Sequence, residues 1–371
     1  MPFDPPFASL EPRRPLLRPA LRPVAIWLFA LCAMVLVMVT LGGATRLSGS
    51  GLSIMEWAPI MGTLPPLTDA EWQRLYALYQ QTPQYELVNQ GFGLAGFKGI
   101  FWLEWTHRLW GRLMGAALLA PLLWFAIRGR IGRGLAFRLA GLLVLGGLQG
   151  AIGWFMVASG FEADRTAVSP YRLVMHLALA VSLYAALLWT ALGVWRLATP
   201  PRHDAINPTL RSLTAVVCAM VALTILAGGF VAGLHAGLTY NTFPLMDGQW
   251  IPDGYATLRP GIRNLFENVA AVQFDHRLLA TLTALLATLL VITGVRSSAR
   301  KPFLALGLAV VLQYALGIAT LLWVVPIALG TAHQALAMLV LTAALAALHS
   351  QTTPSAVHSP LNKPALLRQM L

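Results

Sequence analysis

Residues 104–108 read Glu-Trp-Thr-His-Arg and residues 273–277 read Gln-Phe-Asp-His-Arg, and each stretch leads into a long apolar segment. Two further histidines, His176 and His333, also lie close to the start of apolar segments. A histidine at membrane depth is costly unless it has a partner or a function. We therefore take these four histidines as the starting point for predicting both the fold and the site.

The composition indicates a membrane protein. The chain has 371 residues, of which 57% are hydrophobic and 11% charged, against roughly 25% charged in a soluble domain. Apolar runs of about 18 residues or more are candidate membrane spans. We predict an all-α integral membrane protein with eight transmembrane helices, located in Val24–Thr45, Leu113–Ile127 extended back through Trp102–Arg112, Leu139–Phe161, Leu173–Trp195, Ser212–Met246, Leu278–Val295, and twice in Pro302–Asn362 with a division near Pro326 and Gly330.

The positive charges predict how the chain is oriented in the membrane. Most of the 26 Lys and Arg fall in two tails and the loops of one side, and such loops are normally cytoplasmic. We expect a bacterial inner membrane protein with both termini cytoplasmic. The net charge of +12 is then a topology signal, and no nucleic acid partner is expected. Cys32 and Cys218 lie inside predicted spans, where we expect buried apolar side chains and no disulfide.

The chain also resembles itself. Residues 41–53 match residues 227–239 at an offset of 186, and His107-Arg matches His276-Arg, Gln149 matches Gln313, and His176 matches His333 further on. We predict two tandem four-helix bundles related by internal duplication, at residues 20–198 and 208–352, between tails at 1–19 and 353–371. An even number of spans gives both units the same orientation. All four histidines then lie at one depth, near the periplasmic side.

Each predicted unit offers two histidines on parallel helices, His107 with His176 and His276 with His333. Two imidazoles facing each other across a bundle suit the axial positions of a haem iron. A zinc site needs three or four protein ligands at one point, and none is apparent. We predict haem iron as the metal at both pairs; the alternative is four structural core histidines.

Charged and polar neighbours distinguish the two units. Arg108 and Arg277 follow the histidines and can contact haem propionates, or extend to the membrane interface. Glu104 lies on the same helix face as His107, whereas its counterpart is Gln273. We predict that Glu104 is catalytic, so that the first unit performs proton chemistry or stabilises a cationic intermediate while the second only holds a redox haem; the alternative is a solvated carboxylate at the interface.

His235 has no histidine counterpart, because the matching position of the first unit is Gly49. We expect a structural or loop contact for His235.

Four motifs resemble the haem A synthase family. They are Gly-Leu-Ser-Ile-Met-Glu-Trp-Ala-Pro-Ile-Met-Gly at 51–62, Glu-Trp-Thr-His-Arg-Leu-Trp-Gly-Arg at 104–112, Gly-Leu-Thr-Tyr-Asn-Thr-Phe-Pro-Leu-Met-Asp-Gly at 237–248, and Phe-Asp-His-Arg at 274–277. The likeness runs from about residue 24 to 350. It implies oxidation of the C8 methyl group of haem O to a formyl group through an alcohol, which supplies haem A to cytochrome c oxidase.

The resemblance also implies roles for individual residues. His276 and His333 match the ligands of a bound haem b, His107 and His176 match the histidines that hold the substrate haem, and Glu104 matches the essential carboxylate. The outer-loop cysteine pair of some members is absent, which places the chain with the cysteine-poor branch. Converting a methyl to an aldehyde removes four electrons, and haem b is expected to pass them to an external acceptor.

Partners implied by the resemblance are the haem O substrate and the lipid bilayer, with haem O synthase and oxidase assembly factors as further candidates. Two other functions compete with the enzyme. A two-haem electron-transfer cytochrome would leave both porphyrins unchanged, and a haem carrier or chaperone would hold them exchangeably. The cytochrome gives Glu104 no purpose.

Overall fold

The computed structural model describes residues 18–352 except 59–60, 164, 200–205 and 298. The two predicted tails lie largely outside these residues. In the described part, eight helices are long and apolar enough to cross a membrane, so the predicted all-α membrane fold with eight spans is confirmed. They are α1 (Arg18–Leu47), α4 (Leu94–Ile127), α5 (Arg133–Ala158), α6 (Pro170–Ala198), α7 (Pro208–Gly233), α9 (Val269–Gly294), α10 (Arg300–Leu322) and α11 (Ile327–Ser350).

The helix ends follow local signals. Asn207 and Asn268 accept hydrogen bonds from the first free backbone N–H groups of α7 and α9, and Pro follows Asn207 at the first helical position. The apolar run Ser212–Met246 contains one crossing, as predicted, but α7 already ends at Gly233. A short non-helical segment separates α10, which ends at Leu322, from α11, which begins at Ile327. This separation agrees with the predicted division near Pro326.

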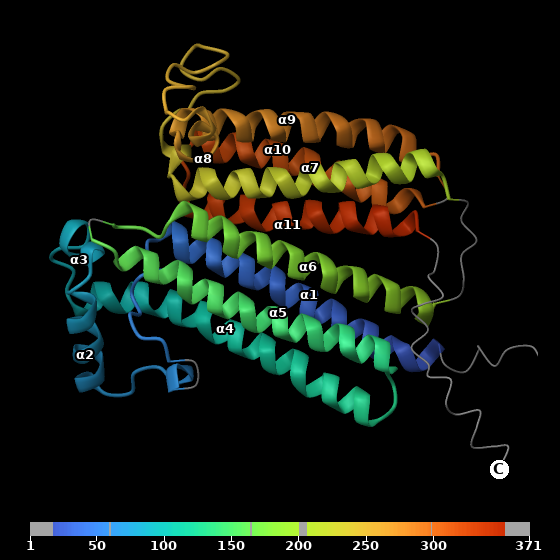
Figure 1. The fold of residues 1–371 in the computed structure, drawn as a ribbon, viewed down its shortest axis with the longest axis horizontal. Helices are drawn as coiled ribbons and strands as arrows, with labels where there is room; N and C mark the ends of the chain where they lie inside the picture. Colours follow the sequence, from blue (N-terminus) through green and yellow to red (C-terminus); the bar gives the residue numbers. More distant parts are fainter. Residues whose placement is uncertain (1–17, 59–60, 164, 200–205, 298, 353–371) are drawn as a thin grey trace, which may run out of the picture.

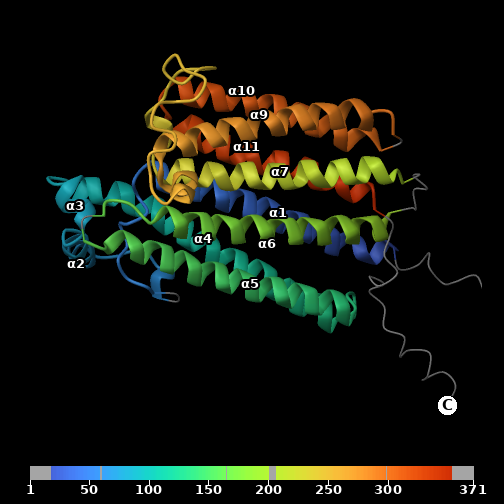
Figure 2. The same cartoon turned by 45° about the horizontal axis from the view of Figure 1, so that its top comes forward.

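The long helices form two groups of four. Figure 1 shows α1, α4, α5 and α6 together, called the first bundle, and α7, α9, α10 and α11 together, called the second bundle. The view in Figure 2 keeps this arrangement. The bundles meet where α1 packs on α11 and α6 packs on α7. One continuous apolar core runs through both bundles and includes Leu28, Val217, Leu306 and Ala344, none of which exposes any measurable surface.

Two free cysteines belong to that core. Cys32 on α1 and Cys218 on α7 are buried, as expected for small apolar side chains within spans.

Both bundles carry their long loops at the same end of the molecule, called here the loop end (Figure 1). Residues 48–93 include α2 (Asp69–Tyr79) and α3 (Pro83–Leu87), which the sequence analysis did not predict. The side chains of Trp72, Tyr79, Phe97 and Phe101 form a separate aromatic cluster that attaches these helices to α4. The segment between α7 and α9 is smaller and contains α8 (Asn264–Glu267).

Candidate functional site

A large cavity of about 1220 Å³ extends between the helices of both bundles. Ordinary small-molecule pockets measure roughly 300–1,000 Å³, so this space exceeds one typical ligand site. Its wall contains every side chain that the sequence analysis selected, namely Glu104, His107, Arg108, His176, His235, His276, Arg277 and His333. The structure therefore brings all the predicted site residues to one connected space, near the loop end.

In the first bundle, His107 on α4 and His176 on α6 line the cavity together. Each imidazole packs against a glycine of a neighbouring helix. A Cβ atom at Gly42 of α1 would lie 3.0 Å from Cε1 of His107, and a Cβ atom at Gly153 of α5 would lie 3.0 Å from Cε1 of His176. Any larger residue at either position would displace the ring.

The second bundle repeats this geometry. His276 on α9 and His333 on α11 also line the cavity together. A Cβ atom at Gly228 of α7 would lie 3.0 Å from Cε1 of His276, and one at Gly317 of α10 would lie 2.8 Å from Cε1 of His333. Four imidazoles thus share one kind of setting, which isolated core histidines would not require.

The ring nitrogens divide into two kinds. The Nδ1 atoms of His107 and His276 are buried and have no hydrogen-bond partner. In contrast, the side-chain amide of Gln149 donates to the His176 carbonyl (3.0 Å) and lies 3.2 Å from both nitrogens of that ring. Gln313 has the same relation to His333, with 3.1 Å to the carbonyl. Unpartnered buried polar atoms call for an explanation. An iron-porphyrin bound between the two histidines of each bundle would use their ring nitrogens as metal ligands.

The four glycines and two glutamines are functional candidates that the sequence analysis missed. Gln149 and Gln313 were aligned but given no role. The signal was present, because Gly42 and Gly228 share the offset of 186, and Gly153 and Gly317 keep the offset of 164 that relates Gln149 to Gln313. It could not be interpreted until the packing of neighbouring helices was known.

Glu104 is buried, with 2% of its surface exposed, so the alternative of a solvated interface carboxylate is wrong. Its Oε2 accepts hydrogen bonds from the backbone N–H of Ser53 (2.8 Å), the Ser53 hydroxyl (2.7 Å) and the backbone N–H of Ile54 (2.9 Å). Its Oε1 accepts two from the Arg108 guanidinium, at 3.0 and 2.6 Å. The carboxylate therefore fastens the loop after α1 onto α4.

Gln273 also connects its helix to the preceding loop, but through different hydrogen bonds. Its amide nitrogen donates to the Ala236 carbonyl (2.8 Å), and its oxygen accepts from Arg277 (3.1 Å). A carboxylate has no hydrogen to donate and collects backbone N–H groups instead. The two loops are thus held by groups of different charge at nearby but not equivalent points, because Ala236 corresponds to Ser50 and not to Ser53 or Ile54.

The two arginines also occupy matching positions. Arg108 donates to the carbonyls of Ile54 and Glu56, and Arg277 donates to the carbonyls of Tyr240 and Thr242, which keeps the offset of 186. These bonds assign both guanidinium groups a role in supporting the loops. Propionate contacts stay a prediction for them; the Nε–H of Arg277 is buried without a hydrogen-bond partner.

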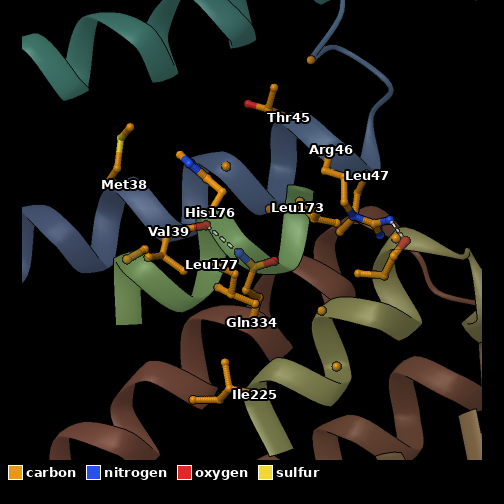
Figure 3. A pocket seen from close by; sticks show the side chains of 18 of the residues that line it. Met38, Val39, Thr45, Arg46, Leu47, Leu173, His176, Leu177, Ile225 and Gln334 are labelled. Atoms are coloured by element: carbon orange, nitrogen blue, oxygen red, sulfur yellow. Dashed lines mark hydrogen bonds between the residues drawn. The ribbon is translucent and has the colours of Figure 1, made fainter. Parts of the chain in front are cut away.

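A polar seam joins the bundles beside the cavity. Arg46 on α1 donates to the Ala232 carbonyl at the end of α7, and Gln334 on α11 donates to the Val39 carbonyl (2.8 Å), as Figure 3 shows. His235 follows α7 in a left-handed conformation (φ 54°). Partial burial and the nearby Arg46 lower the pKa of His235. This position is consistent with a loop contact.

Among the residues described, no cluster of three or more His, Cys, Asp or Glu side chains has metal-ligand geometry. The histidines occur as pairs.

The fold and the site define a class: a multi-pass helical membrane protein with paired histidines inside two neighbouring bundles. Residues 25–345 match the profile of the family described as "Cytochrome oxidase assembly protein" (COX15-CtaA), and the chain belongs to this family. It is 64% identical over 329 residues to "Heme A synthase" of Granulibacter bethesdensis. The aligned residues make up 88% of this chain and 87% of that relative.

Two other relatives are similar over most of their length. "Heme A synthase" of Nitrosospira multiformis is 48% identical over 331 residues, covering 87% of this chain and 92% of the relative. "Heme A synthase 2" of Acidiphilium cryptum is 45% identical over 331 residues, covering 87% and 90%. The family resemblance inferred from the four motifs is confirmed.

Proposed function

We propose that this protein is a haem A synthase, an oxidoreductase that converts the C8 methyl group of haem O to a formyl group through an alcohol. The family membership and the names of the relatives support this activity. The structural observation that carries the proposal is the combination of two equivalent histidine pairs with one buried carboxylate, which lines the cavity in the first bundle only.

The second bundle is proposed to hold the resident cofactor, haem b, through His276 and His333. Both rings pack against a glycine and line the cavity, so these two histidines would hold the haem b iron. A bound haem b supplies one-electron redox chemistry. Gln273 is neutral and its amide is committed to the loop, which suits a bundle that only passes electrons.

The first bundle is proposed to hold the substrate, with His107 and His176 orienting the porphyrin. Glu104, ion-paired with Arg108 (2.6 Å), places a fixed carboxylate close to His107, in surroundings from which most water is excluded. A preorganised charge of this kind stabilises positive charge that develops on the reacting group. Because Glu104 also fixes residues 53 and 54, it determines how the loop covers the porphyrin.

We further propose that both termini are cytoplasmic and that the loop end, with both sites, faces the periplasm of a bacterial inner membrane. The distribution of Lys and Arg supports this orientation. Haem O would arrive from the bilayer or from haem O synthase, and haem A would leave toward oxidase assembly factors.

Pigment analysis tests the activity. The protein would be expressed in membranes with and without haem O, and the extracted porphyrins would be identified by mass. Formyl or hydroxymethyl haem that forms only when haem O is supplied supports the enzyme. Haem b and unchanged haem O would support the electron-transfer cytochrome or the carrier, and would refute the proposal.

A further inference from the structure

The two bundles differ at the gap between their second and third long helices. In the first bundle, this gap lies between α4 and α5 and is lined by Gly115, Gly146, Gly147 and Gly150. A Cβ atom at any of these four positions would meet no neighbouring atom within 4 Å. These glycines border open space, unlike Gly153, whose Cβ position lies against His176. We call this space the glycine slot.

The second bundle fills the corresponding gap. With Gln149 aligned to Gln313, the position of Gly150 corresponds to Tyr314, and Gly146 and Gly147 correspond to Val310 and Val311. The Tyr314 hydroxyl is hydrogen-bonded to the Thr281 hydroxyl at 2.9 Å. This bond joins α10 to α9, and the Phe243 ring packs against Tyr314 from the loop. The Tyr314 side chain therefore fills, in the second bundle, the space that is open beside Gly150 in the first.

Burial of the helices agrees with this difference. The most apolar windows of α4 and α5 have 11% of their residues buried, against 22% for α9 and α10. The helices α10 and α9 also lie in closer contact than α5 and α4 do. Protein interiors normally pack densely, so the loose α4–α5 pair calls for a ligand that completes it.

A second observation places a ligand beside the slot. The buried Nδ1 of His107 has no partner and its side chain lines the same cavity. Gly150 lies about one helical turn from Gly153, the residue that backs His176. From Gly153 to Gly146 the slot extends along α5 for about 10 Å, at 1.5 Å per residue. It leads away from the loop end, toward the apolar middle of the span.

We propose that the glycine slot binds the isoprenoid tail of the porphyrin substrate, and that Tyr314 excludes such a tail from the second bundle. The inference rests on the proposed function, since it takes a tailed haem as the substrate. A long hydrocarbon attached to the porphyrin edge needs an apolar channel that starts at the ring and continues along the membrane-spanning helices. The slot starts beside the histidine pair and runs along α5, and its four defining residues are glycines that leave open space. The bundle that holds haem b, a porphyrin without a tail, needs no such channel.

The test transfers the second bundle's residue into the first. Full-length Gly150→Tyr would be purified from membranes supplied with haem O, and the retained haem O and haem b would be quantified by extraction. We expect at least a tenfold fall in retained haem O and a matching rise in the KM for haem O, while haem b stays at the wild-type level. Gly141→Val is the matched control, because Gly141 also faces open space on α5 but does not line the cavity.

The reciprocal variant keeps the test decisive if Gly150→Tyr does not fold. Tyr314→Gly should open the second bundle, so that haem O replaces part of the haem b there and the extracted ratio of haem O to haem b rises. Unchanged haem O retention in Gly150→Tyr, or an unchanged ratio in Tyr314→Gly, would overturn the slot. Failure of the proposed activity would be recognised separately, because the wild type would then retain haem O without converting it.

Discussion

The two bundles use one scaffold for two environments. In both, glycines on neighbouring helices make room for two imidazoles, and an arginine after the α4 or α9 histidine binds the carbonyls of the preceding loop. Two differences lie in the wall of the same cavity: Glu104 against Gln273, and Gly150 against Tyr314. Under the proposed function, the shared positions would hold a porphyrin in each bundle, and the differing ones would give each bundle its own task.

The loops extend this comparison. The first bundle carries α2 and α3 on an aromatic cluster, with the Trp72 and Phe101 ring centroids 4.9 Å apart. The second has the shorter α8 region, held by Asn268 through hydrogen bonds to Gly254 and Asn264. A larger cover, fastened by a buried carboxylate, suits the bundle in which we place the chemistry, because excluding water strengthens the electrostatic effect of Glu104.

The largest effect should come from removing a proposed axial ligand. His333→Ala should abolish stable haem b binding, since one imidazole alone leaves a coordination position open. Absorption spectra of the purified protein would report the loss. His235→Asn is the control, because Asn tolerates the left-handed backbone at that position, and it should retain haem b. Full haem b content in His333→Ala would break the assignment of the resident cofactor to the second bundle.

Exchanging the carboxylate sharpens the comparison further. Glu104→Gln should lower haem A formation about 100-fold or more, the scale of losing a preorganised electrostatic group, while haem b remains bound. The amide nitrogen would also face N–H donors in either orientation, those of Ser53 and Ile54 at the Oε2 position or those of Arg108 at the Oε1 position. Single-turnover conversion of haem O with parallel haem b spectra would measure both effects. An unchanged haem A yield would remove Glu104 from the mechanism.

A smaller effect is expected from the glycines behind the imidazoles. Gly317→Ala would place a methyl group 2.8 Å from Cε1 of His333, so the ring must shift. Disturbing the support of a metal ligand typically weakens binding by 10–100-fold, and we expect about tenfold for haem b, with altered electron paramagnetic resonance of its iron. Gly153→Ala should weaken haem O retention in the same way but leave the haem b signal unchanged. If both variants affected the same haem, the two pairs would not be separate sites.

Much of the fold could be predicted from sequence because the bilayer imposes long apolar helices, and repetition made each half a check on the other. Three features could not. The helices α2 and α3 are short and polar on average, so their aromatic anchor on Phe97 becomes visible only after folding. The burial of Glu104 depends on a loop that closes over the start of a span. The role of Gly42 depends on how α1 packs against His107, which no periodicity along either helix encodes.

The smallest expected effect tests how firmly the first bundle's loop depends on surface charge. Glu56 and Arg74 form an ion pair (2.7 Å) with both side chains about half exposed. The hydrogen bond from Arg74 lowers the pKa of Glu56. A lowered carboxyl pKa stabilises the fold above the unfolded pKa of about 4.3, and this contribution is lost as pH falls through the folded value. Glu56→Gln should therefore cost about 0.2–1 kcal/mol near pH 7 and nothing near pH 2. Thermal unfolding in detergent at both pH values would measure it, and a loss of several kcal/mol at pH 7 would mean that the ion pair, rather than the buried Glu104 and the aromatic cluster, holds the loop in place.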